Sequence, residues 1–258
     1  MALANDRCIC LRKVEYSETS QILTLFGKRE GIVRVIAKGA HRTTKQGASK
    51  FGGGIDLLDL GEATFTLDLE RQLGTLTEWK LQDGHLGLRK NLRCLYLGQY
   101  AAELVGFLIE EHDAHPELFS RLEQTLTELE SGRAEEAFLA FELDLLRETG
   151  YLAELSNCVS CNALLSDREQ AYFSPLRGGV VCRGCEGVIH DRMQIDPRLL
   201  RMVQTVLRLP RSNGYAHRLP KLTRYQTDPI NRILANHVEH TLGRRMRLPR
   251  FVLGNGLS

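Results

Sequence analysis

The chain has 258 residues, of which 43% are hydrophobic and 26% are charged. These fractions are close to the averages of globular proteins, so they exclude a wholly disordered chain, a collagen-like chain and a coiled-coil rod. No apolar run approaches the 18 residues that a membrane-spanning helix needs, and the N-terminus lacks a basic stretch followed by an apolar core. We therefore expect a soluble intracellular protein of one to three domains that folds without disulfides and enters no membrane.

The net charge is only +2, but the charges are unevenly distributed along the chain. Residues 28–50 contain seven basic side chains and one acid. Residues 99–154 contain fourteen acids and three arginines, whereas residues 196–250 contain twelve basic side chains and three acids. Such asymmetry is typical of a polyanion-binding surface at one or both ends, although charged faces that only solvate the fold are the alternative.

Residues 7–82 have the pattern of short β-strands. In residues 62–70 apolar and polar side chains alternate with a period of two, which indicates a strand with one buried face. Residues 27–31 are predicted to form a hairpin turn, and the glycine-rich basic residues 39–54 a loop. Five strands of this length can close into a small barrel, for which the OB type is the commonest architecture. The predicted strands are 8–14, 21–26, 32–38, 62–70 and 73–80.

Residues 92–152 change to the helical period and predict about three amphipathic helices. Two more helices are predicted to start at Asp196-Pro197 and Asp228-Pro229, because an acidic N-cap followed by proline is a start signal. The predicted fold class is α+β, with an N-terminal OB-type β-barrel followed by an all-α domain that carries a four-cysteine zinc module. The expected domains are residues 1–82 (barrel), 83–155 with 192–258 (helical domain) and 156–191 (zinc module).

Four of the seven cysteines form the strongest chemical motif, C-x2-C-x20-C-x2-C. Two thiolates separated by two residues fit around one tight turn, and two such turns supply the four sulfurs of a tetrahedral site. Four thiolates leave no open position, so we expect one structural Zn²⁺ per chain. The predicted ligands are Cys158, Cys161, Cys182 and Cys185, and Gly178-Gly179 suits a hairpin between the two halves.

Two disulfides, a redox pair and iron are the alternatives for the four cysteines. Disulfides are disfavoured in a reducing cytosol, and a redox site needs one pair rather than two. The spacing alone does not distinguish iron from zinc. We expect the remaining three cysteines, Cys8, Cys10 and Cys94, to be small buried side chains.

The sequence contains no G-x-S-x-G, H-E-x-x-H or G-x4-G-K motif. We therefore identify no catalytic residue, and the pattern favours a binding protein over an enzyme.

Three stretches of the chain resemble the bacterial RecO family of recombination mediators (DNA repair proteins). They are LRKVEYSETSQILTLFGKREGIVRVIAKGAHR, the cysteine block CVSCNALL…YFSPLRGGVVCRGC, and HVEHTLGRRMRLPRFV. His41-Arg42 stands where the family often has two basic residues after A-K-G-A, and Arg-Leu-Pro stands where a Lys-Ser type of sequence is more usual. With the domain order, the resemblance extends over essentially the whole chain.

The resemblance implies an OB-fold, a helical domain and a four-cysteine zinc module. It also implies binding of single- and double-stranded DNA, annealing of complementary strands, and cooperation with RecR. Together the two proteins would help RecA replace single-strand binding protein (SSB) on gapped DNA, in the cytoplasm at the nucleoid.

Basic residues on or between the predicted strands would line the groove through which an OB barrel binds a nucleic-acid strand. Tyr16, Phe26 and Phe51 are candidate stacking residues, although Phe26 fits a core equally well. Residues 198–250 provide a possible surface for a second strand. The predicted DNA-binding residues are Lys28, Arg29, Arg34, Lys38, Arg42, Lys45 and Lys50.

Two other functions fit parts of the sequence. A zinc-bearing OB-fold protein that binds RNA or acts in transcription would prefer structured RNA. A nuclease or transferase hidden among the carboxylates would cleave or modify DNA in the presence of a metal ion.

Overall fold

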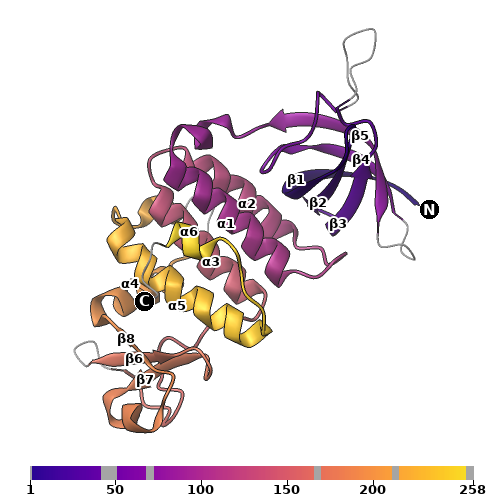
Figure 1. The fold of residues 1–258 in the computed structure, drawn as a ribbon. Coiled ribbons are helices and arrows are strands. Elements are labelled where there is room, and N and C mark those ends of the chain that lie inside the picture. Colours follow the sequence, from indigo (N-terminus) through magenta and orange to yellow (C-terminus); the bar gives the residue numbers. More distant parts are fainter. Residues whose placement is uncertain (1, 42–50, 68–72, 166–169, 211–214, 254–258) are drawn as a thin grey trace. The chain divides into compact units, whose positions relative to one another are not determined.

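The computed structural model describes residues 2–41, 51–67, 73–165, 170–210 and 215–253 (Figure 1). The chain divides into two compact units, residues 1–134 and residues 135–258. Across the described ranges, no helix is both long enough and apolar enough to span a membrane. The predicted residues Arg42, Lys45 and Lys50 lie outside the described ranges.

Five strands of the first unit form a closed barrel in the order β1-β2-β3-β5-β4. All neighbours are antiparallel except β3 and β5, which are parallel. This small barrel fits the predicted OB-type architecture. Its strands are β1 (Ala2–Ser17), β2 (Ser20–Gly27), β3 (Gly31–Ala37), β4 (Leu60–Leu67) and β5 (Gly74–Asp83).

Every second side chain along each strand points into the barrel and fills its interior. Cys8, Cys10, Leu23, Leu25 and Val35 belong to one buried cluster in its interior. The alternation of inward and outward residues follows directly from the pleat of each strand. The prediction that Cys8 and Cys10 are small buried residues is confirmed, and Cys94 on the first helix is buried as well.

A 3-10 helix, η1 (Leu86–Lys90), and two α-helices complete the first unit. The helices are α1 (Leu92–Leu108) and α2 (Pro116–Leu129). The side chain of Asn91 caps α1 by accepting the backbone N–H groups of Arg93 and Cys94. On α2, Phe119 lies against Phe26 of the barrel with 5.7 Å between the ring centroids.

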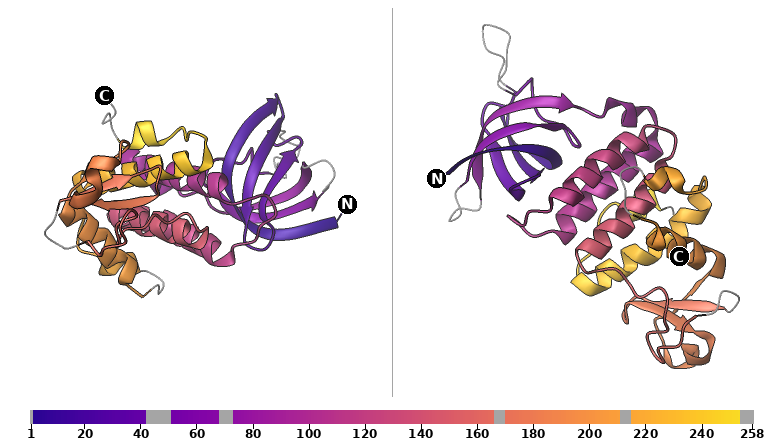
Figure 2. Two further views of the ribbon diagram at one scale, coloured as in Figure 1. Left: turned by 90° about the horizontal axis from the view of Figure 1, so that it is seen from below. Right: turned by 180° about the vertical axis from the view of Figure 1, so that it is seen from behind.

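The second unit contains helices and a small sheet (Figure 2). The sheet has the order β7-β6-β8, and the short η2 follows β7 directly. Its strands and η2 are β6 (Ala171–Ser174), β7 (Gly179–Cys182), β8 (Met193–Ile195) and η2 (Arg183–Val188). Its other helices are α3 (Ala134–Glu148), α4 (Pro197–Arg208), η3 (Tyr215–Arg218), α5 (Arg224–Leu242) and α6 (Pro249–Val252).

One of the two predicted helix starts is confirmed and the other is wrong. Asp196 caps α4 by accepting the backbone N–H of Arg198 at 2.8 Å. In contrast, α5 begins after Thr223, so Asp228-Pro229 lies inside this helix. The side chain of Gln226 accepts the Thr223 N–H at 2.9 Å, so a capping box upstream starts the helix before the aspartate is reached.

A buried carboxylate fixes the turn between β2 and β3. Asp6 on β1 is 1% exposed, and its Oδ2 accepts the backbone N–H groups of Arg29 at 2.8 Å and Glu30 at 3.0 Å. A Cβ on Gly27 would lie 2.4 Å from the same oxygen, so this position requires glycine. The turn that carries Lys28 and Arg29 is therefore held by one side chain.

Replacing this carboxylate is expected to destabilise the barrel. Asp6→Ala removes the buried carboxylate that accepts the partly buried N–H groups of Arg29 and Glu30, which costs about 1–3 kcal/mol in the free energy of unfolding. Urea unfolding followed by circular dichroism measures the change. Glu78→Ala, on an exposed position of β5, is the control and is expected to change stability by less than about 0.5 kcal/mol. Equal stability of the two variants would contradict the role of Asp6.

Candidate metal centre and nucleic-acid interface

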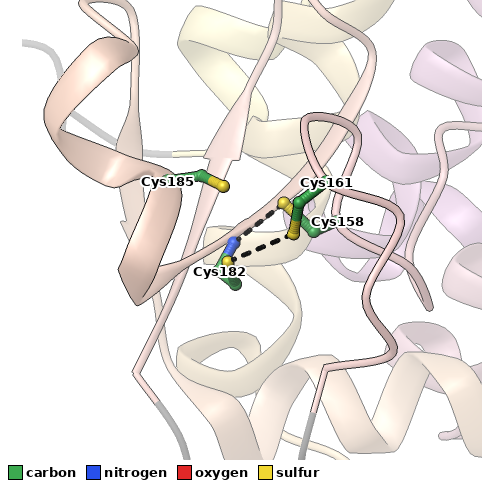
Figure 3. A group of neighbouring side chains, drawn as sticks. All are labelled: Cys158, Cys161, Cys182 and Cys185. Carbon is green, nitrogen blue, oxygen red and sulfur yellow. Dashed lines mark hydrogen bonds between the residues drawn. The ribbon is translucent and has the colours of Figure 1, made fainter.

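The structure brings the four predicted cysteine ligands together (Figure 3). Cys158 and Cys161 lie in one loop, Cys182 ends β7, and Cys185 lies in η2. The four Sγ atoms all lie within 4.8 Å of one another. Residues separated by more than twenty positions thus form one cluster, as the spacing predicts.

The distances in this cluster suit a tetrahedral metal ion. The Sγ atoms of Cys161 and Cys182 are 3.8 Å apart. In a tetrahedron with metal–sulfur bonds of about 2.3 Å, the sulfur–sulfur edge is about 3.8 Å. Four soft thiolates would fill the coordination shell of the metal and leave no open position in it, which suits a structural metal rather than a catalytic one. The residues present therefore fit the expected group.

Backbone contacts bring the two halves of the cluster together. Val159 donates its N–H to the carbonyl of Val180 at 2.9 Å, and Val180 donates to the carbonyl of Glu154 at 2.8 Å. A Cβ on Gly179 would lie 2.5 Å from Val159 and 2.6 Å from the Glu154 carbonyl oxygen, so only glycine permits this approach. Gly178, with φ at +69°, makes the preceding turn. The predicted hairpin at these two glycines is confirmed.

Burial and local hydrogen bonds give the thiols of the cluster different pKa values. Burial opposes ionisation of Cys158, but backbone N–H groups outweigh it and lower the pKa of this thiol to about 6. One of them is the N–H of Cys182, 3.4 Å from the Cys158 sulfur. Burial, together with the neighbouring thiols, raises the pKa of Cys182 to about 12. At neutral pH the metal-free cluster therefore holds a thiolate beside at least one protonated thiol.

The outer surface of β1, β2 and β3 carries successive rows of side chains. The strand register aligns Ile9 with Phe26 and Phe26 with Ile32. These three side chains are buried although they point away from the barrel interior, and α2 contacts this row through Phe119. The helices of the first unit thus cover this row, whereas Arg12, Val14 and Arg34 in the rows beyond it are exposed, and Arg34 lies 4.0 Å from the carboxylate of Glu111.

The uncovered part of this surface combines cations with apolar side chains. The register aligns Arg12 with Thr24 and Thr24 with Arg34, so two arginines lie on either side of one threonine. The next row, formed by Val14, Ile22 and Ile36, is apolar and exposed or half-buried. We call this surface the open face, and its side chains are Arg12, Val14, Tyr16, Ile22, Thr24, Arg34 and Ile36.

The structure separates the predicted DNA-binding residues into groups. Arg34 lies on the open face, and the exposed Lys38 directly follows β3 at its end. Lys28 and Arg29 are also exposed, but they lie in the turn at the other end of the β2–β3 hairpin, beyond the row that the helices cover. Arg29 donates to the carbonyl of Asn5 and to the carboxylate of Asp6.

Two of the three candidate stacking residues are core residues instead. Phe26 is fully buried under α2, and Phe51 is 3% exposed in the barrel interior. Burial removes both rings from any contact with a base, so the stacking prediction is wrong for Phe51, and for Phe26 the alternative of a core residue is confirmed. Tyr16 is 66% exposed at the end of the open face and is the aromatic side chain that remains.

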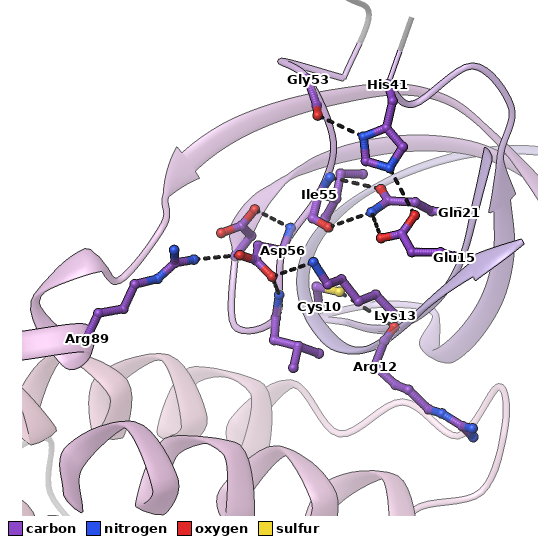
Figure 4. A network of polar contacts seen from close by, with 12 residues as sticks. Cys10, Arg12, Lys13, Glu15, Gln21, His41, Gly53, Ile55, Asp56 and Arg89 are labelled. Carbon is purple, nitrogen blue, oxygen red and sulfur yellow. Dashed lines mark hydrogen bonds and ion pairs between the residues drawn. The ribbon is translucent and has the colours of Figure 1, made fainter. Parts of the chain in front are cut away.

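A polar network ties the residues on either side of the predicted basic loop to the barrel (Figure 4). The imidazole of His41 contacts the Glu15 carboxylate at 2.9 Å and the Gly53 carbonyl at 3.0 Å. The carboxylate of Glu15 raises the pKa of His41. The buried amide of Gln21 bonds both the N–H and the carbonyl of Ile55, at 3.0 and 3.2 Å. His41 and Gly53, on either side of the predicted basic residues 42–50 in the sequence, are therefore held together beside Glu15 of β1.

Arg12 was not among the residues predicted to bind DNA. Its signal was the alternation of Arg12 and Val14, which places both residues on one strand face, and the exposed Tyr16 follows at a second register shift between Glu15 and Ser17. A β-bulge between Cys10 and Arg12, in which Leu11 is the extra residue, determines that the side chains of Arg12 and Val14 point out of the barrel. A bulge has no clear signature in a single sequence, so the pairing of Arg12 with the Arg34 row emerges only in the structure.

Comparisons with known proteins agree with this architecture. The family model described as "Recombination protein O N terminal" matches residues 1–85, and that described as "Recombination protein O C terminal" matches residues 89–249. A DNA repair protein RecO of Rhodopirellula baltica is 35% identical over 179 residues, which are 69% of this chain and 65% of that protein. A DNA repair protein RecO of an Anaeromyxobacter strain is 29% identical over 95% of this chain and 93% of its own length.

Metal binding by the cysteine cluster is expected to release protons. At pH 7.5 a thiol with a pKa of about 12 is protonated, and a metal ligand must be a thiolate, so Cys182 loses its proton on binding. Calorimetric titration of the metal-free protein with Zn²⁺, in buffers of different ionisation enthalpy, should detect at least one proton released per ion. Affinity is expected to fall as the pH is lowered, most steeply once Cys158 is protonated below pH 6.

A Cys161→Ser/Cys185→Ser variant, which loses one thiolate from each half of the motif, is the control for this titration. It should bind Zn²⁺ at least a hundredfold more weakly. Equal affinity of variant and wild type, or binding without any proton release, would contradict a four-thiolate site.

Proposed function

Because the chain belongs to the RecO family of DNA repair proteins, with a role in recombinational repair, we propose that it is a DNA-binding recombination mediator. In this proposal it binds single- and double-stranded DNA, anneals complementary strands, and works with RecR to help RecA replace SSB at gaps. A role on chromosomal DNA places it in the bacterial cytoplasm at the nucleoid. The open face of the barrel is the observation that supports DNA binding most directly.

The composition of the open face suits a single strand. When a protein binds single-stranded nucleic acid without sequence preference, the phosphates contact a cationic groove and the bases contact aromatic side chains. Arg12 and Arg34 lie on two strands separated by β2, so their backbones are about 10 Å apart. Tyr16 lies beyond them with its ring exposed, and the half-buried Ile22 and Ile36 provide an apolar floor. If the phosphates of a DNA strand contact Arg12 and Arg34, the bases of that strand would face the apolar side chains of Ile22 and Ile36.

The remaining predicted cations extend the proposed contact. Lys38 directly follows β3 at the end of the open face, and we assign the predicted cations Arg42, Lys45 and Lys50, which follow it in the sequence, to the same contact. We assign Lys28 and Arg29 to a separate contact, with duplex or with a more distant part of the strand, because the covered row lies between them and Arg34.

Annealing by such a protein needs no nucleotide hydrolysis. Two complementary strands repel each other through their phosphates, and a protein that neutralises both lowers this barrier. The proposed role therefore requires cationic surfaces and no catalytic residue, consistent with the name DNA repair protein that the relatives carry.

We assign a structural Zn²⁺ to Cys158, Cys161, Cys182 and Cys185, with residues 156–191 as its module. When bound, the ion would supply folding free energy by cross-linking the loop of Cys158 and Cys161 to β7 and η2. Val181 and Ile189 pack beside Cys158 in a small hydrophobic cluster that would not by itself hold the module. Metal analysis of the purified protein distinguishes zinc from iron in this geometry.

The open face generates a direct prediction for DNA affinity. If about six cations contact phosphates, the slope of log affinity against log salt for a single strand is about −4, and each lost contact reduces its magnitude by about 0.7. Arg12→Gln/Arg34→Gln should therefore weaken binding of labelled oligo(dT) at least tenfold at low salt and reduce the magnitude of the slope by about 1.4. Fluorescence anisotropy across a salt series measures both quantities.

Lys80→Gln/Lys90→Gln is the matched control, because it removes two exposed charges of the same unit outside the open face. It should change affinity less than threefold. If the control and the open-face variant lose affinity equally, or if the wild type prefers structured RNA to DNA, the proposal is wrong and an RNA-binding or transcription-associated factor becomes the better assignment.

A further inference from the structure

The C-terminal end of the second unit contains a hollow of about 740 Å³. One wall is the second half of α5, and the other is formed by the segment that follows it up to Leu253. Gly243, in the left-handed conformation, ends α5 and reverses the chain. We call this hollow the arginine groove, and its arginines are Arg232, Arg244, Arg245, Arg247 and Arg250.

Specific contacts hold the returning segment in place. The N–H of Met246 donates to the Glu239 carboxylate at 2.8 Å, and the guanidinium of Arg232 donates to the Leu253 carbonyl at 2.6 Å. Met246, Val252 and Leu253 are buried. The groove is therefore a formed feature of the second unit, and Arg232 has a structural part in it.

The lining of the groove is strongly cationic. Five of its thirteen residues are arginines and one, Glu239, is an acid, whose carboxylate accepts the Met246 N–H. The helix dipole stabilises a positive charge near the C-terminal end of α5. One or two side chains are enough for this effect, so it does not account for five arginines around one hollow. The positive charge of Arg245 and Arg250, the two arginines on which the proposal rests, favours an anionic ligand.

The arginines suit phosphates in particular. Arg245 is exposed on the turn after α5, and the guanidinium of Arg250 lies 4.6 Å above the ring centroid of Phe251. Stacking fixes the plane of this guanidinium and leaves its N–H edge for an anion, and the planar fork of arginine matches two oxygens of one phosphate. Phe251 is 56% exposed beside the groove, which offers a ring to a base.

We propose that the arginine groove is a second nucleic-acid site, which binds the phosphate backbone of one strand while the open face binds another. This inference rests on the proposed DNA-binding function and deepens it. The two sites lie in different compact units, so one chain presents two cationic surfaces for two strands. Annealing then follows from simultaneous occupancy, because each strand is neutralised on its own surface before the two pair.

Strand bridging by the full-length protein tests this proposal. Donor-labelled and acceptor-labelled oligo(dT) cannot pair, so energy transfer between them reports two strands held together by protein. Arg245→Gln/Arg250→Gln keeps Arg232 and its contact with Leu253, and should reduce both bridging and the annealing rate of complementary strands at least tenfold. Its affinity for one labelled strand at the open face should change less than threefold.

Arg201→Gln/Arg208→Gln is the matched control, because it removes two exposed charges from α4 outside the groove. It should keep bridging within twofold of wild type. The proposal is overturned if the groove variant bridges strands as well as this control does. It is also overturned if a polyglutamate peptide binds the groove while bridging persists in the variant, because the occupant is then an acidic protein segment. A wild type that binds no DNA would instead refute the underlying function.

Discussion

The register that joins β1, β2 and β3 determines which side chains leave the barrel and where. Because successive residues of a strand point to opposite sides, a slip of one residue would bury Arg34 and expose Val33 and Val35. With the observed register, Thr24 lies between two arginines and Phe26 lies between two apolar side chains. The same constraint therefore provides both the apolar row that the helices cover and the cationic row that stays in solvent.

This arrangement explains how one small barrel both joins a helical region and remains available for a ligand. The row of Ile9, Phe26 and Ile32 is buried under the helices of the first unit, which stabilises their packing through the hydrophobic effect. The turn beyond that row depends on Asp6, whose buried carboxylate satisfies the backbone of Arg29 and Glu30. The next rows receive no such cover. A binding surface thus remains where the packing of helices ends.

The cysteine cluster obeys a different and more local constraint. Two loops approach closely because Gly178 turns the chain and Gly179 leaves room for Val159 and Glu154. The four thiols are then positioned by backbone geometry, and the backbone N–H groups that lower the pKa of Cys158 come from the same two loops. The clustering of the four cysteines is encoded in short segments, which explains why their spacing was sufficient to predict it.

The sequence predicted features that depend on local pattern and missed those that depend on contacts between distant segments. The five strands, the α4 cap at Asp196 and the four clustered cysteines follow from periodicity, capping and spacing. Phe26 and Phe51 resemble stacking residues in sequence, but helix packing and the barrel interior bury them. The start of α5 was misplaced because two helix-start signals compete within six residues. Arg12 joins the open face through a bulge that no single-sequence pattern reveals.

We propose that single-stranded DNA lies across the open face of the barrel. Photo-crosslinking with an oligonucleotide that contains 5-iodouracil, followed by mass spectrometry of the peptides, reports which side chains touch bases. We expect adducts on Tyr16, with the neighbouring β1 and β3 peptides next in abundance, and their loss when unlabelled oligo(dT) competes. Adducts confined to other surfaces, with none on β1, β2 or β3, would contradict it.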